Sequence, residues 1–458
     1  MEQMVVDTVE AIPSSGLRAG ILSPTEVLAQ SISTIAPTTT PTMTIPLVFA
    51  LCGAGTWFAY LLAMIAMLLV GLCVSRFARY SSCAGSVYTY VSSSMPPLVG
   101  GIAAWALLLA YVATACSVAG GFINYANVFA VQMLHHTLPG PLLGLVCVAA
   151  ATFIAYRDVQ VSARMMLWIE AASIVLISVV LALLIAKSGL HLDLAQLSLH
   201  GVAQVKTPGI VLAIFSFVGF ESATTLGTEA RNPQRTIPRA VIQSAFFAGC
   251  FFILCSYLET QGMAALGQNL GKSDAPMRAL SAYAGVGPLG QLIDLGALVS
   301  LFACTLACLT AAARVLLRMG QDGLAHRSFA KTHSRNATPG AAVIATGLLT
   351  AIPVMALAAK GVSGMDIYGY TGSLAVYGFL TVYGLAAIAL PRFLKTQGHL
   401  NGAAIGLSIA AVCAMLAALG GTLYPVPEAP YNWLPYVYLA YIAGGIAWQM
   451  FKAKPATV

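Results

Sequence analysis

The sequence predicts an all-α polytopic membrane protein, and three observations lead to that prediction. Only 8% of the 458 residues are charged, against about 25% in an ordinary soluble domain. Hydrophobic residues make up 59% of the chain, and its mean hydropathy is +0.85. No Asp, Glu, Lys or Arg lies between Glu26 and Arg76, or between Arg79 and Arg157. Because one bilayer crossing needs about 20 apolar residues, each uncharged run holds more than one span.

Apolar runs bounded by charges, glycine and proline divide the chain into twelve predicted transmembrane helices. The residues before the first span, 1–25, are polar and acidic and do not resemble a cleaved signal peptide, so we expect a cytoplasmic tail there. The predicted spans are 26–50, 53–75, 98–127, 139–156, 161–187, 207–226, 238–262, 286–319, 340–360, 366–390, 401–421 and 432–451.

The distribution of basic residues predicts a multi-pass protein of the cell membrane with both termini in the cytoplasm. In that arrangement seventeen of the 22 Lys and Arg residues lie on the cytoplasmic side, which is the positive-inside bias. Because the basic residues are scattered at the ends of apolar runs, the net charge of +7 indicates topology and no nucleic-acid partner. The five on the outer side are Lys187, Lys206, Lys272, Arg278 and Lys360.

The residues that usually bind metals or catalyse reactions are not arranged for either task. The ten cysteines lie mostly inside apolar runs and never in a C-x-x-C pattern, which argues against a zinc site or a disulfide framework. No P-loop, H-E-x-x-H or G-x-S-x-G motif occurs. The sequence therefore predicts no metal site, no cofactor and no enzymatic activity.

The first and sixth spans each contain residues that interrupt a helix. Span 1 carries Pro37, Pro41 and Pro46; because proline removes a backbone donor and clashes with the preceding turn, we expect a break between Pro37 and Pro41. Span 6 carries Gly219 and the ionisable Glu221 at mid-depth, which favours unwinding near Gly219. Paired breaks five spans apart indicate an inverted-repeat transporter with its site at the midplane, since irregular backbone at that depth is tolerated where it lines a cavity. The alternative is two helices that are merely kinked.

Three segments resemble motifs of one transporter superfamily. The segment from Phe215 to Val241, FSFVGFESATTLGTEARNPQRTIPRAV, combines F-x-G-F-E, E-A-x-N-P and R-x-I-P. The second segment runs from Arg314 to Pro339, and the third, SCAGSVYTY, from Ser82 to Tyr90. On these motifs the chain resembles the permeases of the amino acid–polyamine–organocation (APC) superfamily over spans 1 to 10.

The resemblance implies a LeuT-type fold in which helices 1 and 6 are broken and five helices repeat in inverted orientation. The transporter core then covers residues 26–390, with repeats at about 26–187 and 207–390. Residues 391–458 hold helices 11 and 12 and a short cytoplasmic tail, and match only as hydrophobic helices. Known members carry amino acids, polyamines and related amines, and hold the substrate between the two broken helices.

The break in span 1 offers groups that suit a substrate carboxylate. We expect the second half-helix to begin with Thr40 as its N-cap and Pro41 in the first helical position. The free N–H groups and positive dipole end of such a half-helix attract an anion. Family members usually have a Gly-Ser-Gly-like segment where this chain has Thr38, Thr39 and Thr40. Because Pro41 cannot donate, the hydroxyls of Thr39 and Thr40 are expected to help.

The break in span 6 offers carbonyl groups that suit a substrate ammonium. The first half-helix should end with free carbonyls from Phe215 through Ser216 to Val218, just before Gly219. Family members often place an aromatic residue at the position of Phe215 as a lid over the substrate. The alternative for Phe215 is packing that faces either the lipid or the core. Tyr111, at mid-depth in span 3, either lines the pocket or packs with its hydroxyl bonded to a backbone carbonyl.

Two acids follow the break in span 6. A charge at mid-depth costs several kcal/mol unless it is hydrated or paired. Glu221 either contacts a cationic group or stabilises the start of the second half-helix through its dipole, and we favour the structural role. Glu229 lies at the cytoplasmic end beside Arg231 and is expected to form an ion pair in a gate or loop.

Span 5 bears on the coupling ion. In several proton-coupled relatives it carries a lysine that stands in for a sodium ion against helices 1 and 8, and an ungapped comparison puts Ser173 at that position. Glu170 lies three residues earlier on nearly the same helical face, and is either the protonatable group or a structural acid with satisfied hydrogen bonds. A sodium site would instead need hydroxyls of span 8, between Ser300 and Thr305.

Together these features predict a secondary active transporter that takes up amino acids by alternating access, with H⁺ or Na⁺ as the coupling ion. Its partners are the lipid bilayer and a small amino acid or amine, and its oligomeric state stays open. The alternative within the class is a transporter or exchanger of polyamines, diamines or other organic amines with Glu221 or Glu170 as counter-ion. A non-transporting amine sensor is the alternative from another class, and should carry a soluble signalling domain that tails of about 25 and 7 residues do not supply.

Overall fold

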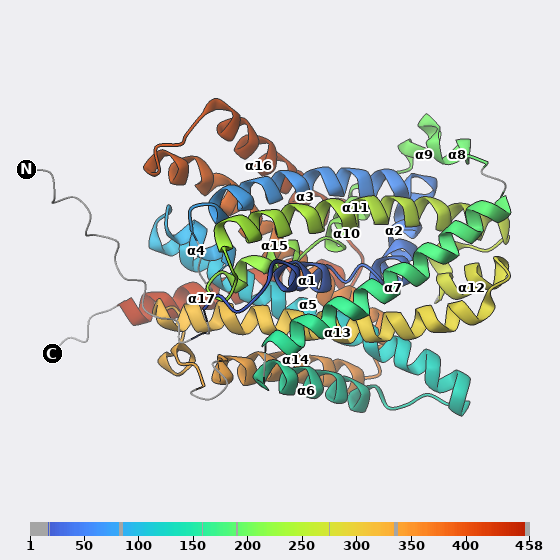
Figure 1. The fold of residues 1–458 in the computed structure, drawn as a ribbon, viewed down its shortest axis with the longest axis horizontal. Helices are drawn as coiled ribbons and strands as arrows, with labels where there is room; N and C mark the ends of the chain where they lie inside the picture. The colour runs from blue at the N-terminus through green and yellow to red at the C-terminus, as the bar shows by residue number, and fades with distance from the viewer. Residues whose placement is uncertain are drawn as a thin grey trace, which may run out of the picture.

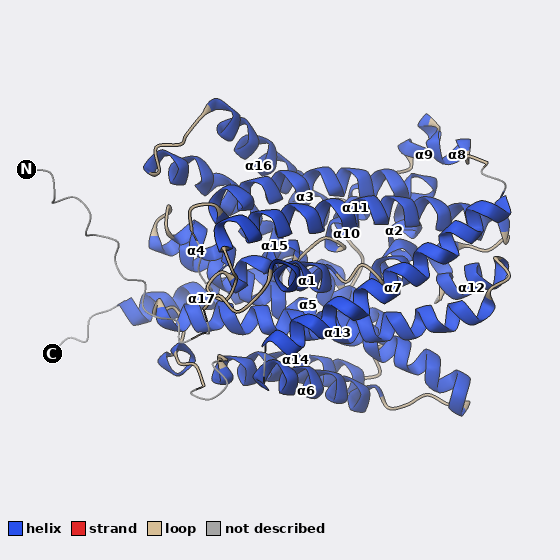
Figure 2. Ribbon diagram, viewed as in Figure 1, coloured by secondary structure: helices blue, strands red, loops and turns tan. Residues whose placement is uncertain are grey.

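The protein is described by a computed structural model that covers residue 17 and residues 19–81, 86–157, 159–188, 191–273, 275–333 and 338–453. Regular structure in these residues is helical (Figure 2), apart from one isolated parallel bridge between Leu22 and Ala230. Parts of two family-like segments, 82–85 and 334–337, lie outside the described residues, as does most of both tails.

Helices follow the order and approximate bounds of the predicted spans. Within the described residues, ten stretches are long and apolar enough to cross a membrane, and the first of them, Pro24–Ala78, has 55 residues. The long segments are α1 (Pro24–Ile35) with η1 (Thr40–Thr44) and α2 (Ile45–Cys52), α3 (Thr56–Ala78), α5 (Pro97–Leu134), α6 (Gly140–Arg157), α7 (Val159–Ser188), α10 (Thr207–Phe215) with η3 (Phe220–Leu226), α11 (Pro233–Ala265), α13 (Gly287–Gln321), α14 (Gly340–Ala359), α15 (Gly364–Thr396), α16 (Gly402–Leu423) and α17 (Leu434–Ala453).

Short helices join the long ones at the two ends of the bundle (Figure 1). One end holds α4 (Ser86–Ser92) and the C-terminal end of α17. The other end holds α8 (Leu194–Leu197), α9 (Leu199–Ala203) and α12 (Pro276–Tyr283). The remaining short turns are η2 (Gly53–Gly55), η4 (Leu270–Lys272), η5 (Arg327–Ala330) and η6 (Tyr431–Trp433).

The centre of the bundle is built by α5, α13 and α15, whose small residues allow close packing. A Cβ atom added to Gly364 would lie 2.6 Å from the carbonyl oxygen of Gly120, and one added to Gly378 would lie 2.6 Å from that of Ala106. Small residues at such crossings let membrane helices approach backbone to backbone. Because α5 and α15 pack closely, Tyr111 of the one and Tyr383 of the other can both reach Glu221 in η3.

The periphery of the bundle is apolar and exposed. Phe153 on α6, Trp168 on α7 and Ile352 on α14 are among the large hydrophobic side chains that face outward. A soluble protein rarely exposes such a contiguous apolar surface, whereas a bilayer covers it without cost. The periphery is therefore the lipid-facing surface, and buried polar side chains gather in the interior.

Candidate functional site

The first helical segment of span 1 is α1, which ends shortly before Pro37. It begins with a capping box, in which the Ser23 hydroxyl accepts from the Glu26 N–H at 3.3 Å. It ends at Ile35, because Ala36 takes a left-handed conformation with φ of 49° and Pro37 has no N–H to continue the hydrogen-bond ladder. Helical structure resumes with η1 at Thr40.

The N-cap of η1 is Thr39, one residue earlier than predicted. The Thr39 N–H donates to the Ala36 carbonyl at 2.9 Å and its hydroxyl donates to the same oxygen at 2.8 Å. These two bonds close a turn at Thr39, so that Thr40 becomes the first residue of η1 and Pro41 the second. The expectation of Thr40 as the N-cap was therefore wrong by one position. The Thr40 hydroxyl is buried and has no hydrogen-bond partner among the described residues.

In span 6, α10 ends at Phe215 and η3 begins at Phe220. Gly219, between them, has φ of 88°, which glycine adopts without strain. The carbonyls of Phe215 and Phe217 accept from backbone N–H groups three residues on, at 3.3 and 3.2 Å. Those of Ser216 and Val218 accept no hydrogen bond from the described part of the chain. Two of the four predicted carbonyls therefore remain available.

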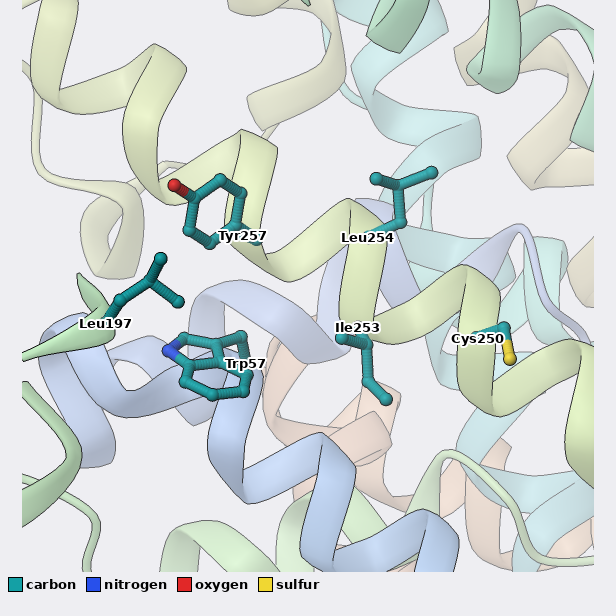
Figure 3. A pocket seen from close by; sticks show the side chains of 6 residues that line it. All are labelled: Trp57, Leu197, Cys250, Ile253, Leu254 and Tyr257. Carbon is teal, nitrogen blue, oxygen red and sulfur yellow. The ribbon is translucent and has the colours of Figure 1, made fainter. Parts of the chain in front are cut away.

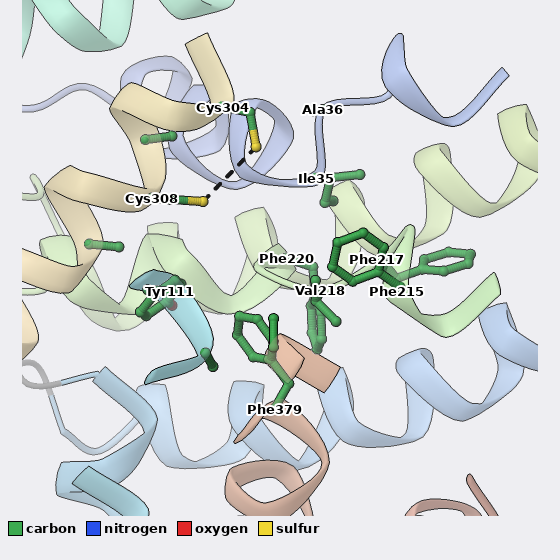
Figure 4. Close-up of a cluster of buried hydrophobic side chains, with 14 of the residues drawn as sticks. Ile35, Ala36, Tyr111, Phe215, Phe217, Val218, Phe220, Cys304, Cys308 and Phe379 are labelled. Carbon is green, nitrogen blue, oxygen red and sulfur yellow. Dashed lines mark hydrogen bonds between the residues drawn. The ribbon is translucent and has the colours of Figure 1, made fainter. Parts of the chain in front are cut away.

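The two interrupted segments contact each other in the interior, in the region where Figure 4 labels Ile35 and Val218. A Cβ atom at Gly219 would lie 2.2 Å from Cγ2 of Thr34, in the last turn of α1. The Ser222 hydroxyl donates to the Thr34 hydroxyl at 2.9 Å, and the Ser31 hydroxyl donates to the Phe220 carbonyl at 2.6 Å. Side chains of each segment thus satisfy polar groups of the other, which fixes their relative position.

Phe215 points into the protein and is only 6% exposed. Its ring meets that of Tyr368 on α15 edge to face, with centroids 5.8 Å apart. The Tyr368 hydroxyl is 2.8 Å from that of Thr44 in η1. Ser216 beside it is 3.3 Å from the hydroxyl of Tyr60 on α3. Phe215 therefore packs in the interior near η1, and the lipid-facing alternative for it is excluded.

Glu221 is held by two tyrosines. The Tyr111 hydroxyl donates to Oε1 of Glu221 at 2.7 Å, and the Tyr383 hydroxyl donates to Oε2. The hydroxyl of Tyr111 on α5 therefore donates to a carboxylate. One of the two interpretations from sequence had a backbone carbonyl as its acceptor. All three side chains are buried. Sequence reasoning missed Tyr383, which lies on α15 about 160 residues from its partner and carries no local signal.

Some, but not all, of the residues considered for ion coupling contact one another. Oε2 of Glu170 on α7 accepts from the Thr38 hydroxyl at 3.1 Å, and Oε1 accepts from the Ser300 hydroxyl on α13. Ser173, one turn further on, lies against Gly296, where an added Cβ would be 2.6 Å from its Oγ. Thr305 does not join this group, because its hydroxyl donates to the Leu301 carbonyl at 2.9 Å within α13.

Glu229 forms its ion pair with Arg314 on α13 and not with the neighbouring Arg231. Nε and NH2 of Arg314 lie 2.6 and 2.9 Å from the two carboxylate oxygens. Glu229 lies in a turn, in which its N–H donates to the Leu226 carbonyl at 3.0 Å. The side chain of Arg231 is engaged elsewhere, because its Nε donates to the Gly20 carbonyl at 3.1 Å.

One groove on the surface lies apart from this interior site (Figure 3). It has a volume of about 380 Å³ and an almost wholly apolar lining. None of its residues is among the predicted site residues, and its position between α3, α11 and α8 puts it on the outer surface of the bundle. The lining residues are Trp57, Leu197, Cys250, Ile253, Leu254 and Tyr257.

Comparison with known proteins identifies the family. The family model described as "Amino acid permease" matches residues 26–443. The branched-chain amino acid permease BcaP of Bacillus subtilis is 26% identical over 317 residues, covering 66% of this chain and 67% of that protein. The low-affinity putrescine importer PlaP of Escherichia coli K12 is 26% identical over 312 residues, covering 65% of this chain and 66% of that protein.

A solved structure shares the fold. The crystal structure of MhsT in complex with L-phenylalanine superposes with a TM-score of 0.59 at 16% identity, and the match covers 89% of this chain and 99% of that one. The fold is thus the LeuT-type fold that the resemblance implied. With a family match that extends over most of its length, the chain belongs to the amino acid permease family of the APC superfamily, whose members are membrane transporters and not enzymes.

Proposed function

We propose that this permease is a secondary active transporter that takes up amino acids by alternating access, with the substrate bound between the two interrupted segments. The observation that carries the proposal is the direct contact of these segments at Thr34 and Gly219 in the buried centre of the bundle. It brings the Ser216 and Val218 carbonyls, which accept no hydrogen bond from the described chain, close to the end of α1, as in transporters with a midplane site. The similarity to BcaP supports an amino acid as the substrate.

In this proposal each end of the amino acid has its own half-site. The ammonium group donates to the carbonyls of Ser216 and Val218, which accept no hydrogen bond from the described chain. The carboxylate lies at the start of η1, where the Thr40 hydroxyl, which has no partner among the described residues, supplements the backbone N–H groups. The Thr39 hydroxyl is already bonded to the Ala36 carbonyl. Phe215 covers the bound side chain.

We further propose that the protein has twelve transmembrane helices in two inverted repeats, at about 26–187 and 207–390, with spans 1 and 6 broken. Pro24–Ala78 has 55 residues, enough for two crossings of about 20 residues each. The 20-residue helix α17 completes the count beyond the ten stretches. An even number of crossings leaves both termini on one side, and the distribution of basic residues makes that side the cytoplasm.

Topology can be tested with reporter fusions. A reporter at Val458, which lies outside the described residues, should be active as a cytoplasmic fusion, whereas one inserted beside Lys272 in η4 should report the outer side. The physical reason is that seventeen basic residues hold their loops in the cytoplasm. Activity of both reporters on one side would contradict the twelve-helix arrangement.

The coupling ion is proposed to be H⁺ or Na⁺. Of the two roles considered for Glu170, we propose the structural one. Both of its carboxylate oxygens accept hydrogen bonds from hydroxyl groups, those of Thr38 at the break and Ser300 on α13. Glu170 thereby links three elements, α7, the break in span 1 and α13.

A polyamine or diamine substrate is the second candidate. The specific observation in its favour is that Glu170 supplies a carboxylate at the break in span 1. A polyamine or diamine has no carboxylate of its own, and Glu170 would take the place of that group. The similarity to the putrescine importer PlaP points the same way.

Purified protein in proteoliposomes tests the function. A panel of radiolabelled branched-chain, aromatic and cationic amino acids together with putrescine should identify a substrate that accumulates under an inward H⁺ or Na⁺ gradient. Accumulation of an amino acid supports the first candidate, and accumulation of putrescine alone supports the second. Binding of a compound without uptake or exchange would identify a sensor and contradict the proposal.

Phe215 and Phe217 provide a matched pair for the substrate site. Burying a phenylalanine side chain is worth about 1.5–3 kcal/mol, so Phe215→Ala is expected to raise the KM for uptake roughly tenfold to hundredfold. Phe217 is buried against Phe252, with ring centroids 5.2 Å apart, so Phe217→Ala should cost about 3–5 kcal/mol of stability with little change in KM. Uptake kinetics per folded protein measure this; equal changes in KM would argue that Phe215 only packs.

A further inference from the structure

Glu259 differs from the other buried acids of the interior. It lies on α11 with no exposed surface, and neither carboxylate oxygen has a hydrogen-bond partner among the described residues. Glu170, Glu221 and Glu229, in contrast, each accept two hydrogen bonds from side chains on other elements. Sequence reasoning did not select Glu259, because its neighbours on α11 form no motif.

The position of Glu259 connects it to both interrupted segments. α11 packs against η1 and α3, and Glu259 interacts electrostatically with Tyr60 on α3 and Tyr125 on α5. The Tyr60 hydroxyl is 3.3 Å from Oγ of Ser216 in the break of span 6. The Tyr125 hydroxyl donates to the Thr42 carbonyl in η1 at 3.0 Å. Each of the two tyrosines that sense the charge of Glu259 thus contacts one half of the proposed substrate site.

The cations on the surrounding elements are engaged elsewhere. Arg278 on α12 donates to Asp294 on α13 at 2.5 Å. Lys187 on α7 donates to the Tyr283 carbonyl, and Lys272 in η4 is exposed. The titratable groups that face Glu259 are Tyr60, Tyr125 and Cys255, which is one turn earlier on α11. None of these supplies a positive charge.

A buried carboxylate without a partner is costly, since its ionised form loses hydration and gains no counter-charge. Acids kept inside a membrane-spanning bundle mark ion or proton pathways by default. Glutamine would fill the same volume without that cost. A cation that reaches Glu259 in one conformation but not the other can drive alternating access, because a ligand shifts a conformational equilibrium by its difference in affinity.

We propose that Glu259 binds the monovalent cation, H⁺ or Na⁺, that is coupled to transport. The inference rests on the proposed function as a secondary active transporter. Binding neutralises the carboxylate, and the hydroxyls of Tyr60 and Tyr125 transmit the change to Ser216 and Thr42, so that cation and substrate bind with positive cooperativity. The Glu259 carboxylate offers oxygen atoms that accept a proton or bind a hard alkali cation.

The test compares the parent protein with Glu259→Gln and with Glu428→Gln, which removes an exposed carboxylate outside the bundle. In proteoliposomes a tenfold inward cation gradient should sustain up to about tenfold accumulation by the parent at one cation per substrate. Glu259→Gln should accumulate no substrate and yet retain counterflow exchange, because exchange needs no net cation movement. Glu428→Gln should behave as the parent does.

A second readout needs no transport. The melting temperature of the detergent-solubilised parent should rise on adding Na⁺ at fixed pH if the cation is Na⁺. It should change with pH in choline chloride, without a Na⁺ effect, if the cation is H⁺. Glu259→Gln should lose whichever response the parent has. Glu259→Asp, which keeps the charge on a shorter side chain, should retain the response with an apparent cation affinity lowered about tenfold. If Glu259→Gln does not fold, Glu259→Asp takes its place as the test variant.

Three outcomes would overturn the inference. One is a Glu259→Gln protein that still accumulates substrate under the cation gradient and keeps the parent's melting response. Another is a change confined to the KM of cationic substrates, which would make Glu259 a substrate contact. The third is an unaltered cation affinity in Glu259→Asp. Each is distinct from failure of the proposed function, in which the parent itself transports no compound of the panel.

Discussion

Replacing Gly219 by alanine is expected to abolish transport. The residue has φ of 88°, and a side chain in that conformation costs about 1–3 kcal/mol of strain. The new Cβ would also lie 2.2 Å from Cγ2 of Thr34. Thr34 cannot rotate away freely, because its hydroxyl donates to the Gln30 carbonyl at 2.8 Å and accepts from Ser222 at 2.9 Å. The contact between the two breaks must therefore open.

Gly444→Ala on α17 is the matched control for Gly219→Ala. Nothing lies within 4 Å of a Cβ atom at that position, and alanine in a helix is favoured over glycine by about 1 kcal/mol. Uptake in proteoliposomes, corrected for folded protein by size-exclusion chromatography, should fall at least about a hundredfold for Gly219→Ala, as a strain of about 3 kcal/mol at the site allows. Near-parental uptake by a folded Gly219→Ala protein would mean that the contact is dispensable.

Glu170→Ala should lose most transport, whereas Glu170→Gln should retain it. Alanine leaves the hydroxyls of Thr38 and Ser300 without an acceptor, at about 1–3 kcal/mol for each buried group. It also releases the break in span 1 from α7 and α13. Glutamine keeps an oxygen that accepts and an amide that donates, and either hydroxyl can reverse its role, so the tie survives without a charge.

Accumulation and counterflow, measured together, separate the two roles of Glu170. If Glu170 is structural, the Glu170→Gln protein should accumulate substrate against its gradient as well as the parent does. The Glu170→Ala protein should lose both accumulation and counterflow. A Glu170→Gln protein that loses pH-driven accumulation but keeps counterflow would instead identify Glu170 as the protonated group. That result, combined with an unaffected Glu259→Gln, would move the coupling site from α11 to α7.

The fold was predictable because the signals for it are local. Stretches of about 20 apolar residues define spans whatever their neighbours are, so the predicted range 340–360 differs by a single residue from α14 (Gly340–Ala359). Proline at position 37 and glycine at position 219 act on their own turn of backbone. The N-cap was predicted one residue too late, at Thr40 instead of Thr39. The cause is that Thr39 donates its N–H and its hydroxyl to the Ala36 carbonyl, which is left without a helical partner by the break itself.

The partners within the site were less predictable because they come from distant parts of the chain. Glu221 was selected for its place after Gly219, but Tyr383 reaches it from α15. Arg231 was paired with Glu229 by proximity in sequence, whereas Arg314 approaches from α13. Glu259 was passed over because a carboxylate without a partner is recognisable only once its surroundings are known. Local sequence thus indicates where α1 and α10 end, but not which side chains meet there.

The most direct test of substrate binding between the two interrupted segments is an experimental structure with a transported substrate bound. We expect the substrate between residues 38–40 and 215–219, with its ammonium nitrogen within about 3.2 Å of the Ser216 or Val218 carbonyl oxygen. Both segments should remain interrupted. A substrate held elsewhere in the bundle, or an unbroken helix through Gly219 in the bound state, would contradict this expectation.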